Sequence, residues 1–264
     1  MPTSALHVAR TGLEAQDARM RVIANNLANI GTTGYKRDRV NFATLSYQDE
    51  RVAGQQSSNE TAYATGLNLG TGVAVQSTTA ITTQGTLTTT GNSLDLALDG
   101  EGYFQVQLPG GKLAYSRAGN FSRSADGQLV TAQGYALQPA IQVPEDAASI
   151  TVANDGTVSV TTAASATPTE IGQVTIASFA NPSGLQALGD NFLAETGASG
   201  AAQIGAAGDG VRGSIRQGML EGSNVKPAQV LIEMVEAQRL YDMRTKLIAT
   251  AKELDEGGAG LMRL

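Results

Sequence analysis

The side chains best suited to catalysis or metal binding are scarce in this chain of 264 residues, which has one histidine, His7, and no cysteine. A Ser-His-Asp triad or a histidine-based zinc site would have to be built around that single imidazole. The absence of cysteine also excludes disulfides, thiolate catalysis and cysteine-based zinc sites. We therefore expect His7 to be a surface or interface residue rather than a catalytic one.

Two short motifs contain the residue types that phosphate and cation sites use. Residues 110–112 (GGK) resemble the end of a phosphate-binding loop, but Val106 occupies the position of its first glycine, so we expect a hairpin turn. Asp95, Asp99 and Glu101 could line one patch, either as a structural turn or as a cation site. Apart from that alternative, the sequence predicts no catalytic, metal-binding or cofactor-binding residues, and therefore a protein that is not an enzyme.

Composition restricts the partners of the chain. The net charge is -6 and no basic cluster occurs, which argues against nucleic acid as a partner. No apolar run reaches the length of a transmembrane helix, so we expect no direct insertion into a membrane. The N-terminus lacks the apolar segment of a secretory signal, so export would need a route without a cleaved signal. With 41% hydrophobic residues, the chain can still form a core.

An apolar seam with heptad spacing runs along the N-terminal end. One set of seam positions recurs every seven residues, and a second set lies three residues after each member of the first. This a/d pattern predicts an amphipathic helix with one polar break, at Gln16. We expect the helix to end between Asn29 and Gly34, where glycine interrupts the period. The seam consists of Leu6, Ala9, Leu13, Gln16, Met20, Ile23, Leu27 and Ile30.

A second helical pattern occupies the C-terminal end. No glycine occurs between Ser223 and Glu256, and Pro227 fits the first turn of a helix. A helix over residues 227–256 would be about 45 Å long at 1.5 Å per residue. Its seam is interrupted at Arg244, and we expect the glycine-rich residues 257–260 to interrupt the helix itself. The seam consists of Val230, Met234, Ala237, Tyr241, Ile248 and Ala251, widened by Leu240, Leu247 and Leu254.

Two such seams at opposite ends of one chain indicate assembly. A single amphipathic helix commonly lies on its own domain, but a pair suggests that the helices meet each other or copies of themselves in neighbouring subunits. Isolated helices are marginal in water, so we expect both to be largely unfolded in the free subunit. The predicted interface residues are Leu6, Leu13, Met20, Ile23, Asn25, Asn26, Leu27, Asn29 and Ile30, with Val230, Met234, Ala237, Leu240, Tyr241, Leu247 and Ile248.

The residues between the helices predict a mixed α and β fold. Residues 34–70 are polar enough to form an extended arm or a flexible linker. From Gly70 onward the period becomes two, with half-buried strands around Val73 and at Leu94 to Leu98, and with turns at Asp-Gly and Gly-Gly pairs. Residues 197–213, rich in glycine and alanine, are expected to be a loop. We expect a terminal helical domain (1–33 and 224–264), an arm (34–70) and an all-β domain (71–223).

Two motifs mark the ends of the chain: residues 23–30 (IANNLANI) followed by residues 32–36 (TTGYK), and residues 221–225 (EGSNV) followed by residues 234–241 (MVEAQRLY). They resemble the N-terminal and C-terminal signatures of the bacterial flagellar rod and hook family. Asn25, Asn26 and Asn29 could hydrogen-bond neighbouring backbone or cap the helix end. Internal matches are residues 72–73, 84–87, 99–106 (DGEGYFQV), 115–121 (YSRAGNF) and 127–130.

The resemblance implies a structural subunit that assembles helically into a hollow shaft. Chain length, residues 66–72 (GLNLGTG), residues 139–144 (PAIQVP) and a polar arm are most similar to the distal rod members of the family. Such a shaft would transmit motor torque to the hook, with the paired terminal helices as a coiled-coil-like inner tube, the arm as a middle layer and the β domain outside. The arm residues implied are Tyr47, Gln56, Ser57 and Ser58.

The resemblance also implies partners and a location. The expected partners are copies of the chain itself, proximal rod proteins, the hook protein, a rod-capping protein, the L- and P-ring proteins and the flagellar type III export apparatus. The expected location is the basal-body rod, between the periplasm and the outer membrane, and Phe42 is a candidate centre of the export signal. A proximal rod subunit, a hook subunit and a secreted β-rich adhesin are the alternatives. A secreted enzyme would need a cluster of acid, base or nucleophile that the sequence lacks.

Overall fold

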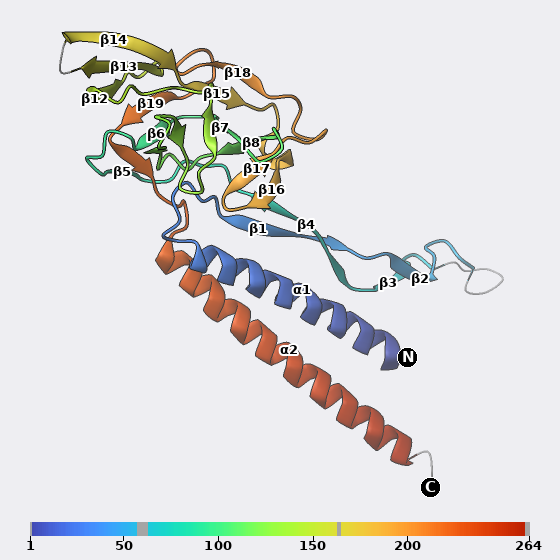
Figure 1. Ribbon diagram of the computed structural model, residues 1–264. Coiled ribbons are helices and arrows are strands. Elements are labelled where there is room, and N and C mark those ends of the chain that lie inside the picture. The colour runs from blue at the N-terminus through green and yellow to red at the C-terminus, as the bar shows by residue number, and fades with distance from the viewer. Residues whose placement is uncertain (1, 57–62, 163–164, 262–264) are drawn as a thin grey trace. The chain divides into compact units, whose positions relative to one another are not determined.

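The computed structural model describes residues 2–56, 63–162 and 165–261 (Figure 1). The fold is mixed, because helices occupy both ends of the chain and a large β-rich region lies between them in the sequence. The chain divides into two compact units. Unit 1 contains Met1–Leu27, Asp38–Thr79 and Pro227–Leu264, and unit 2 contains Ala28–Arg37 and Ala80–Lys226.

The helices α1 (Pro2–Ala28) and α2 (Pro227–Leu261) belong to unit 1. The end of α1 and the start of α2 agree with the sequence prediction, but the expected interruption at residues 257–260 was wrong, because α2 continues to Leu261. Each helical glycine costs only about 1 kcal/mol relative to alanine, while helix propagation adds one hydrogen bond per residue. Neither helix, within the described residues, combines the length and apolar character that crossing a membrane requires.

A two-stranded ribbon forms the rest of unit 1. The strand β1 (Asp38–Thr44) pairs with β4 (Val73–Ala80), and β2 (Tyr47–Arg51) pairs antiparallel with β3 (Leu67–Gly70). The amide of Leu45 donates to the carbonyl of Gly72 (3.0 Å), which keeps the two pairs in one continuous ribbon.

Unit 2 is built from short strands that follow the predicted turns. Its main sheet has the order β16-β17-β8-β7-β11-β10-β9, and β15 joins it by pairing with both β7 and β18. These strands are β7 (Tyr103–Gln107), β8 (Leu113–Ser116), β9 (Ser122–Arg123), β10 (Leu129–Val130), β11 (Ala136–Gln138), β15 (Thr175–Ser178), β16 (Gln186–Gly189), β17 (Phe192–Ala194) and β18 (Gln203–Ala206).

Smaller sheets complete unit 2. One has the order β12-β13-β14, and the pairs β6-β19 and β5-β20 form two more. A short 3₁₀ helix, η1 (Pro182–Gly184), precedes β16. The strands are β5 (Leu87–Thr89), β6 (Leu96–Asp99), β12 (Ala147–Val152), β13 (Thr157–Thr162), β14 (Ser165–Gln173), β19 (Ser214–Gln217) and β20 (Met219–Glu221).

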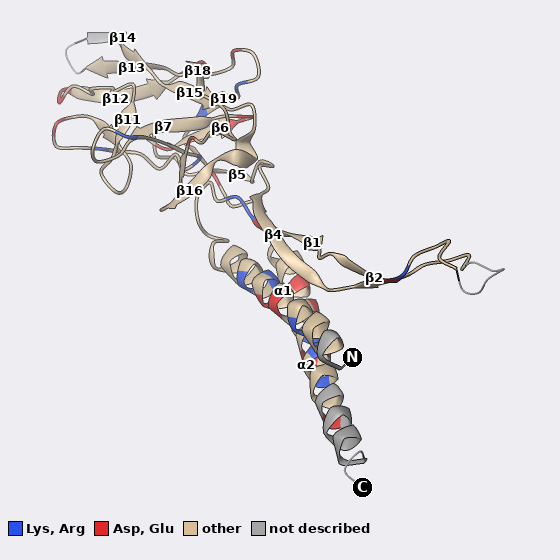
Figure 2. Cartoon of the chain, turned by 90° about the vertical axis from the view of Figure 1, so that its right-hand side faces the viewer, with Lys and Arg blue, Asp and Glu red and all other residues tan. Residues whose placement is uncertain are grey.

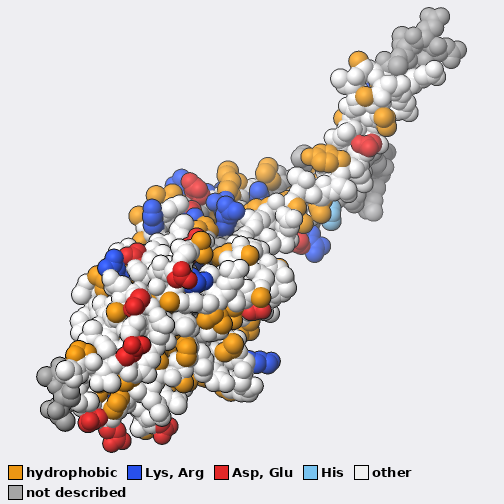
Figure 3. Space-filling model, turned by 90° about the horizontal axis from the view of Figure 1, so that it is seen from above, with side chains coloured by type: hydrophobic (Ala, Val, Ile, Leu, Met, Phe, Trp, Pro, Cys, Tyr) orange, Lys and Arg blue, Asp and Glu red, His pale blue; other side chains and the backbone are white. Residues whose placement is uncertain are grey.

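The core of unit 2 surrounds β7. Phe104 is fully buried and meets Phe121 edge to face, with 5.2 Å between ring centroids. Leu98 and Ile176 pack into the same cluster. On the face of unit 2 seen in Figure 3, hydrophobic side chains occur in scattered small groups with isolated charges between them. Unit 2 therefore has a core of its own, although Leu188, Ile204 and Val211 are at least half exposed.

Two predictions within unit 2 need correction. Residues 197–213 are not simply a loop, because β18 pairs with β15 through backbone hydrogen bonds that glycine and alanine can also make. The strand β6 is buried on both faces rather than half-buried, because Ala97 as well as Leu96 and Leu98 is excluded from solvent. A small side chain at the alternate position lets neighbouring chain cover that face as well.

Candidate assembly site: terminal helices and a three-segment junction

The helices of unit 1 run side by side in opposite directions (Figures 1 and 2). Ile23 on α1 and Val230 and Ala237 on α2 are buried, whereas Leu247 is 65% exposed. Asn26 is buried and Asn25 is exposed. The other predicted interface residues are half-buried, namely Leu6, Leu13, Met20, Leu27, Asn29, Ile30, Met234, Leu240, Tyr241 and Ile248.

Polar breaks in both seams connect one helix to the other. Gln16 Nε2 donates to the backbone oxygen of Ala237 at 3.0 Å, and Arg244 Nη1 donates to the backbone oxygen of Gly12. Going from Gln16 back to Gly12 on α1, the partner moves forward from Ala237 to Arg244 on α2, which is the order expected of antiparallel helices. The two residues that interrupt the apolar pattern are thus the ones that hydrogen-bond across the pair.

The opposite side of α2 carries uncovered apolar side chains. The row Leu231, Val235, Met243 and Leu247 follows steps of four or eight residues, so it winds by about 160° around the side of the helix that faces away from α1. Each is between 47% and 65% exposed, and Ile232 beside the row is 61% exposed. Charged residues recur along both helices (Figure 2), and the side chains of Arg10 and Glu14 form an exposed ion pair at 2.8 Å. A hydrophobic surface of this size usually marks a contact surface.

The ribbon is attached to α1 at two points. The side chain of Asn26 donates to the backbone oxygen of Asp38 and accepts from its amide, both at 2.8 Å. Farther along, the amide of Val73 donates to Thr11 Oγ1 at 3.3 Å. The separation along α1 is about 22 Å at 1.5 Å per residue, and β1 with the next residue, Leu45, spans about 23 Å at 3.3 Å per residue. The strand and the helix are therefore matched in length.

Most side chains of the ribbon are exposed, including those that the sequence singled out. Tyr47 is 61% exposed and Phe42 is 41% exposed. Gln56 is also exposed, whereas Ser57 and Ser58 lie outside the described residues. An isolated two-stranded ribbon is marginally stable in water. Burial at the foot of the ribbon raises the pKa of the Asp38 carboxyl.

In unit 2, three segments distant in sequence meet at what we call the junction: residues 33–37, 81–86 and 221–224. Backbone hydrogen bonds join Gly34 N to Glu221 O (2.7 Å), Ile81 N to Arg37 O (2.8 Å) and Gly222 N to Thr86 O (2.8 Å). Asn224 adds its side chain, which accepts from the amide of Arg37 (2.7 Å) and donates to the carbonyl of Ile81 (2.8 Å). The N-terminal and C-terminal signatures of the sequence therefore bind each other directly.

A buried ion cluster lies at the centre of the junction. Glu221 Oε1 accepts from Lys36 Nζ at 2.5 Å and from the amide of Gly85 at 2.8 Å. Its second oxygen accepts from Arg117 Nη1 at 3.1 Å. Burial lowers the pKa of Lys36 more than its hydrogen bond and ion pair with Glu221 raise it, and Arg117 adds to the lowering. The cluster thus combines several partners around one carboxylate that is fully buried.

Close backbone approaches explain two signature glycines of the junction. Gly34 has a left-handed φ of 68°, and a Cβ there would come within 2.6 Å of the backbone carbon of Arg117. A Cβ at Gly85 would come within 2.0 Å of the carbonyl oxygen of Gly222. Atoms cannot approach so closely without moving the backbone, so a side chain at either position would open the junction.

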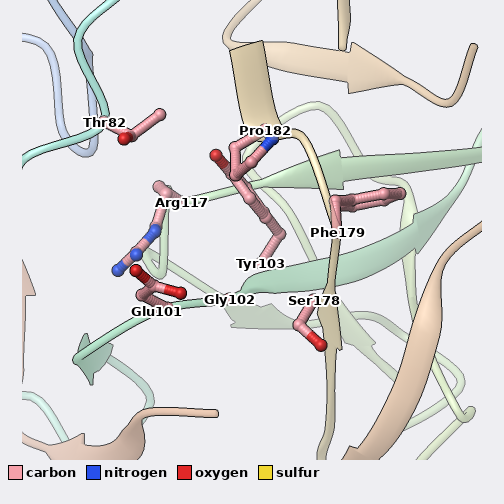
Figure 4. Close-up of a pocket in the computed structure, with 8 residues that line it drawn as sticks. All are labelled: Thr82, Glu101, Gly102, Tyr103, Arg117, Ser178, Phe179 and Pro182. Atoms are coloured by element: carbon pink, nitrogen blue, oxygen red, sulfur yellow. The ribbon is translucent and has the colours of Figure 1, made fainter. Parts of the chain in front are cut away.

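A small pocket lies on the other side of Arg117 (Figure 4). The Tyr103 and Phe179 rings meet edge to face at 5.9 Å, and the Arg117 guanidinium carbon lies 5.5 Å from the Tyr103 ring centroid. Burial raises the pKa of Tyr103. Aromatic packing and the ion pair of Arg117 account for these side chains. The lining consists of Thr82, Glu101, Gly102, Tyr103, Arg117, Ser178, Phe179 and Pro182.

The candidate cation site is a structural turn. Asp95 accepts from Thr90 Oγ1 at 2.6 Å and from Asn92 Nδ2 at 3.0 Å, while Asp99 pairs with Arg216 at 3.2 Å. In the part of the chain that the structure describes, no three His, Asp or Glu side chains converge as metal ligands would. Residues 110–112 form the predicted hairpin turn, and His7 is exposed on α1.

Sequence reasoning placed no functional role on Lys36, Arg117, Glu221 or Asn224. Each belongs to a quoted motif, but a motif does not state which partner its residues meet. A basic residue in one terminal signature and an acidic residue in the other were the available signal. Their separation of 185 residues hid the pairing.

Comparisons with known proteins agree with the two signatures. A model described as flagella basal body rod protein matches residues 6–36, a flagellar hook protein FlgE/F/G D1 domain matches residues 97–160, and a flagellar basal body rod FlgEFG protein C-terminal region matches residues 216–261. The hook protein FlgE of Brucella abortus is 38% identical, but over 58% of this chain and 35% of its own length.

Matches to rod proteins cover nearly the whole chain. The flagellar basal-body rod protein FlgG of Agrobacterium fabrum is 46% identical over 95% of this chain and 96% of its own length. The FlgG proteins of Caulobacter vibrioides and Borreliella burgdorferi are 43% and 39% identical, each over 95% of this chain and, respectively, 96% and 95% of their own lengths. The chain therefore belongs to the FlgG family of flagellar basal-body rod proteins, which are structural subunits and not enzymes.

Proposed function

We propose that this rod subunit assembles with copies of itself into the distal part of the rod, a hollow and rigid shaft that transmits motor torque to the hook. In this proposal, α1 and α2 pair as a coiled-coil-like inner tube. The arm of residues 34–70, which contains β1, β2 and β3, bridges neighbouring subunits, and the β-rich domain lies outside. The domain boundaries that follow are 1–33 with 224–264, 34–70 and 71–223.

The observation that carries the proposal is the uncovered apolar surface of unit 1. Leu231, Val235, Met243 and Leu247 form a wide band on α2 in which each side chain is between 47% and 65% exposed. The ribbon likewise exposes Tyr47 on a strand pair that is too small to be stable alone. Burial of apolar area is the main driving force of association, so neighbouring copies would stabilise both elements.

The proposal includes the other members of the flagellar basal body. A shaft of this kind would contact proximal rod proteins at one end and the hook protein at the other, and a rod-capping protein during growth. The L- and P-ring proteins would surround it between the periplasm and the outer membrane. We propose delivery by the flagellar type III apparatus without a cleaved signal, with Phe42 as the centre of an export signal. The rod relatives match over their full length and the hook relative does not, which favours a rod subunit.

The assembly experiment replaces seam residues with aspartate in the full-length chain. Leu27→Asp and Met234→Asp should block assembly, because a carboxylate in a buried seam has no partner. The control is Gln238→Asp, which adds the same charge at an exposed position of α2. Purified subunits would be concentrated with rod fragments as nuclei and imaged by electron microscopy.

Wild type and the control should form tubes with a central channel, and the two seam variants should not. Circular dichroism in the β region would verify that unit 2 stays folded in each variant. Normal tubes from Met234→Asp would show that the seam is wrongly assigned. Absence of tubes from the wild type under nucleating conditions would count against self-assembly itself.

A further inference from the structure

The junction of unit 2 contains more buried positive charge than negative charge. The side chains of Lys36, Arg117 and Glu221 are 9%, 6% and 0% exposed, respectively. Among the described residues, Glu221 is the only carboxylate within ion-pair distance of either cation. Two cations therefore share one counter-ion in a place that water hardly reaches.

Each charged group belongs to a different stretch of the chain. Glu221 is 185 residues from Lys36 and 104 residues from Arg117. Lys36 Nζ also donates to the carbonyl of Thr83 (2.9 Å), and Arg117 Nη2 donates to the carbonyl of Gly100 (2.7 Å). The amide of Gly85 donates to Glu221 as well. The carboxylate of Glu221 is thus the common partner of segments that have no sequence proximity.

The same segments are where the chain passes between its two units. The chain enters unit 2 at Ala28, leaves it after Arg37, returns at Ala80 and leaves again after Lys226. The last three of these four connections adjoin the junction. Each of these positions is next to, or within two residues of, a hydrogen bond of the junction, made by Arg37, Ile81 and Asn224. A pulling force transmitted through the backbone at these connections therefore acts on the junction first. This holds for any arrangement of the two units, because the connections are covalent.

We propose that Glu221 is the positioning residue of an ion-pair clasp, which holds these three connections to unit 2 and opens when its carboxylate is neutralised, while the β core stays folded. The clasp itself does not depend on the assembly proposal. Its mechanical role rests on the proposed function. In a rod subunit that transmits torque, a closed clasp would prevent the chain from lengthening at these connections.

Because the clasp has two cations and one anion, removing the anion should be more harmful than removing one cation. Glu221→Gln keeps the size of the side chain but leaves two buried cations without a counter-ion. Lys36→Met keeps most of the lysine's apolar volume and leaves Arg117 and Glu221 as a neutral pair. The double variant leaves one buried cation instead of two. Glu221→Gln should therefore open the clasp most, and adding Lys36→Met should partly close it again.

Hydrogen exchange of the full-length subunit measures the opening directly. The reporters are the amides of Gly34, Arg37, Gly85 and Asn224, each of which donates a hydrogen bond inside the junction. In Glu221→Gln these amides should exchange roughly a hundredfold faster or more, because uncompensated buried charge is strongly destabilising. In Lys36→Met the increase should be about tenfold at most, and in the double variant exchange should be roughly tenfold slower than in Glu221→Gln.

The matched control is Asp99→Asn, which neutralises an exposed carboxylate that also pairs with an arginine, Arg216, at 3.2 Å. It should leave the junction amides unchanged. Amides that pair β7 with β15 report on the β core and should keep wild-type exchange in Glu221→Gln. Unchanged junction exchange in Glu221→Gln would overturn the proposal. The proposal would also be overturned if Lys36→Met accelerated junction exchange as much as Glu221→Gln does. The same holds if the double variant exchanged its junction amides as fast as Glu221→Gln, whether or not the β core also exchanges faster.

Discussion

Unit 1 and unit 2 obtain their stability in different ways. Unit 2 has a core in which Leu98, Phe104 and Ile176 are fully buried. In unit 1, the structure describes only four buried hydrophobic residues, and two of them have the small side chain of alanine. They are Ala15, Ile23, Val230 and Ala237. On the outer side of α2, larger side chains such as Leu231 and Leu247 are exposed instead.

The contrast shows how one chain can be both a folded body and a polymerising element. A β unit with its own core does not need neighbours, since its apolar area is already removed from water. The helices and the ribbon of unit 1 leave apolar side chains exposed, which neighbouring copies would cover in the proposed assembly. Glu221 and its partners lie in unit 2, next to three of the positions where the chain changes from one unit to the other.

Truncating the core should produce the largest difference between the units. Phe104→Ala removes a fully buried ring that packs on Phe121, which should lower the free energy of unfolding of unit 2 by about 3–5 kcal/mol. Val235→Ala on the outer face of α2 should change stability by about 0.5 kcal/mol or less, because its side chain is 47% exposed. Urea denaturation followed by circular dichroism compares the two. Equal losses would mean that unit 1 also has a core.

Replacing a glycine of left-handed conformation by alanine should cost more stability inside the junction than in an exposed turn. Gly34→Ala should cost about 2–4 kcal/mol, since the new Cβ adds a collision with the backbone of Arg117 to the strain of a positive φ. Gly110→Ala should cost only about 1 kcal/mol, because its φ is 84° but nothing lies within 4 Å of a Cβ there. Denaturation midpoints of the two variants measure the difference. Similar midpoints would argue against tight packing of the junction.

In unit 1, the attachment of the ribbon to α1 should depend on the side-chain amide of Asn26. Asn26→Ala removes both hydrogen bonds to the backbone of Asp38, which should cost about 1–3 kcal/mol and expose β1 to proteases. Arg21→Ala on the same helix breaks an exposed pair with Asp17 and should cost about 0.5 kcal/mol or less. Limited proteolysis mapped by mass spectrometry tests both. Protection of β1 in Asn26→Ala would show that other contacts hold the ribbon.

Local patterns in the sequence were enough to place the helices, the Asp-Gly turns and a minority of the strands, such as β6 and β7. The seam period identified α1, and Pro227 identified the start of α2. Pairing between distant segments was not accessible in this way, because periodicity reports which face is apolar and not which partner covers it. Asn26 was noted as a possible backbone partner, but the strand that it binds could not be named.

The misses have a common physical origin. The strand β18 was missed because its backbone hydrogen bonds need no particular side chain, and Glu221 was missed because its partners lie 104 and 185 residues away. Gln16 and Arg244 were recognised as interruptions of the apolar pattern. Their role in hydrogen bonding across the helix pair became evident only from three-dimensional positions.

The smallest expected effect concerns the pH dependence of the junction. Burial lowers the pKa of Lys36 from 10.5, so between the lowered value and 10.5 the unfolded chain binds more protons at this residue than the folded chain does. Stability must then rise with pH across that interval. Glu221 and Arg117 are the charged groups that act on Lys36, and Tyr103, whose pKa is raised, opposes the trend above pH 10.0.

Comparing wild type with Lys36→Met isolates the lysine, since Tyr103 is present in both proteins. As pH rises from neutral toward 10.5, unit 2 of the wild type should gain stability relative to the variant, measured by urea denaturation at each pH. Arg21→Ala is the control: its series should run parallel to that of wild type, because it keeps Lys36 and the altered side chain is exposed in unit 1. A relative loss of wild-type stability with rising pH would mean that the ion pair with Glu221, and not burial, dominates at Lys36.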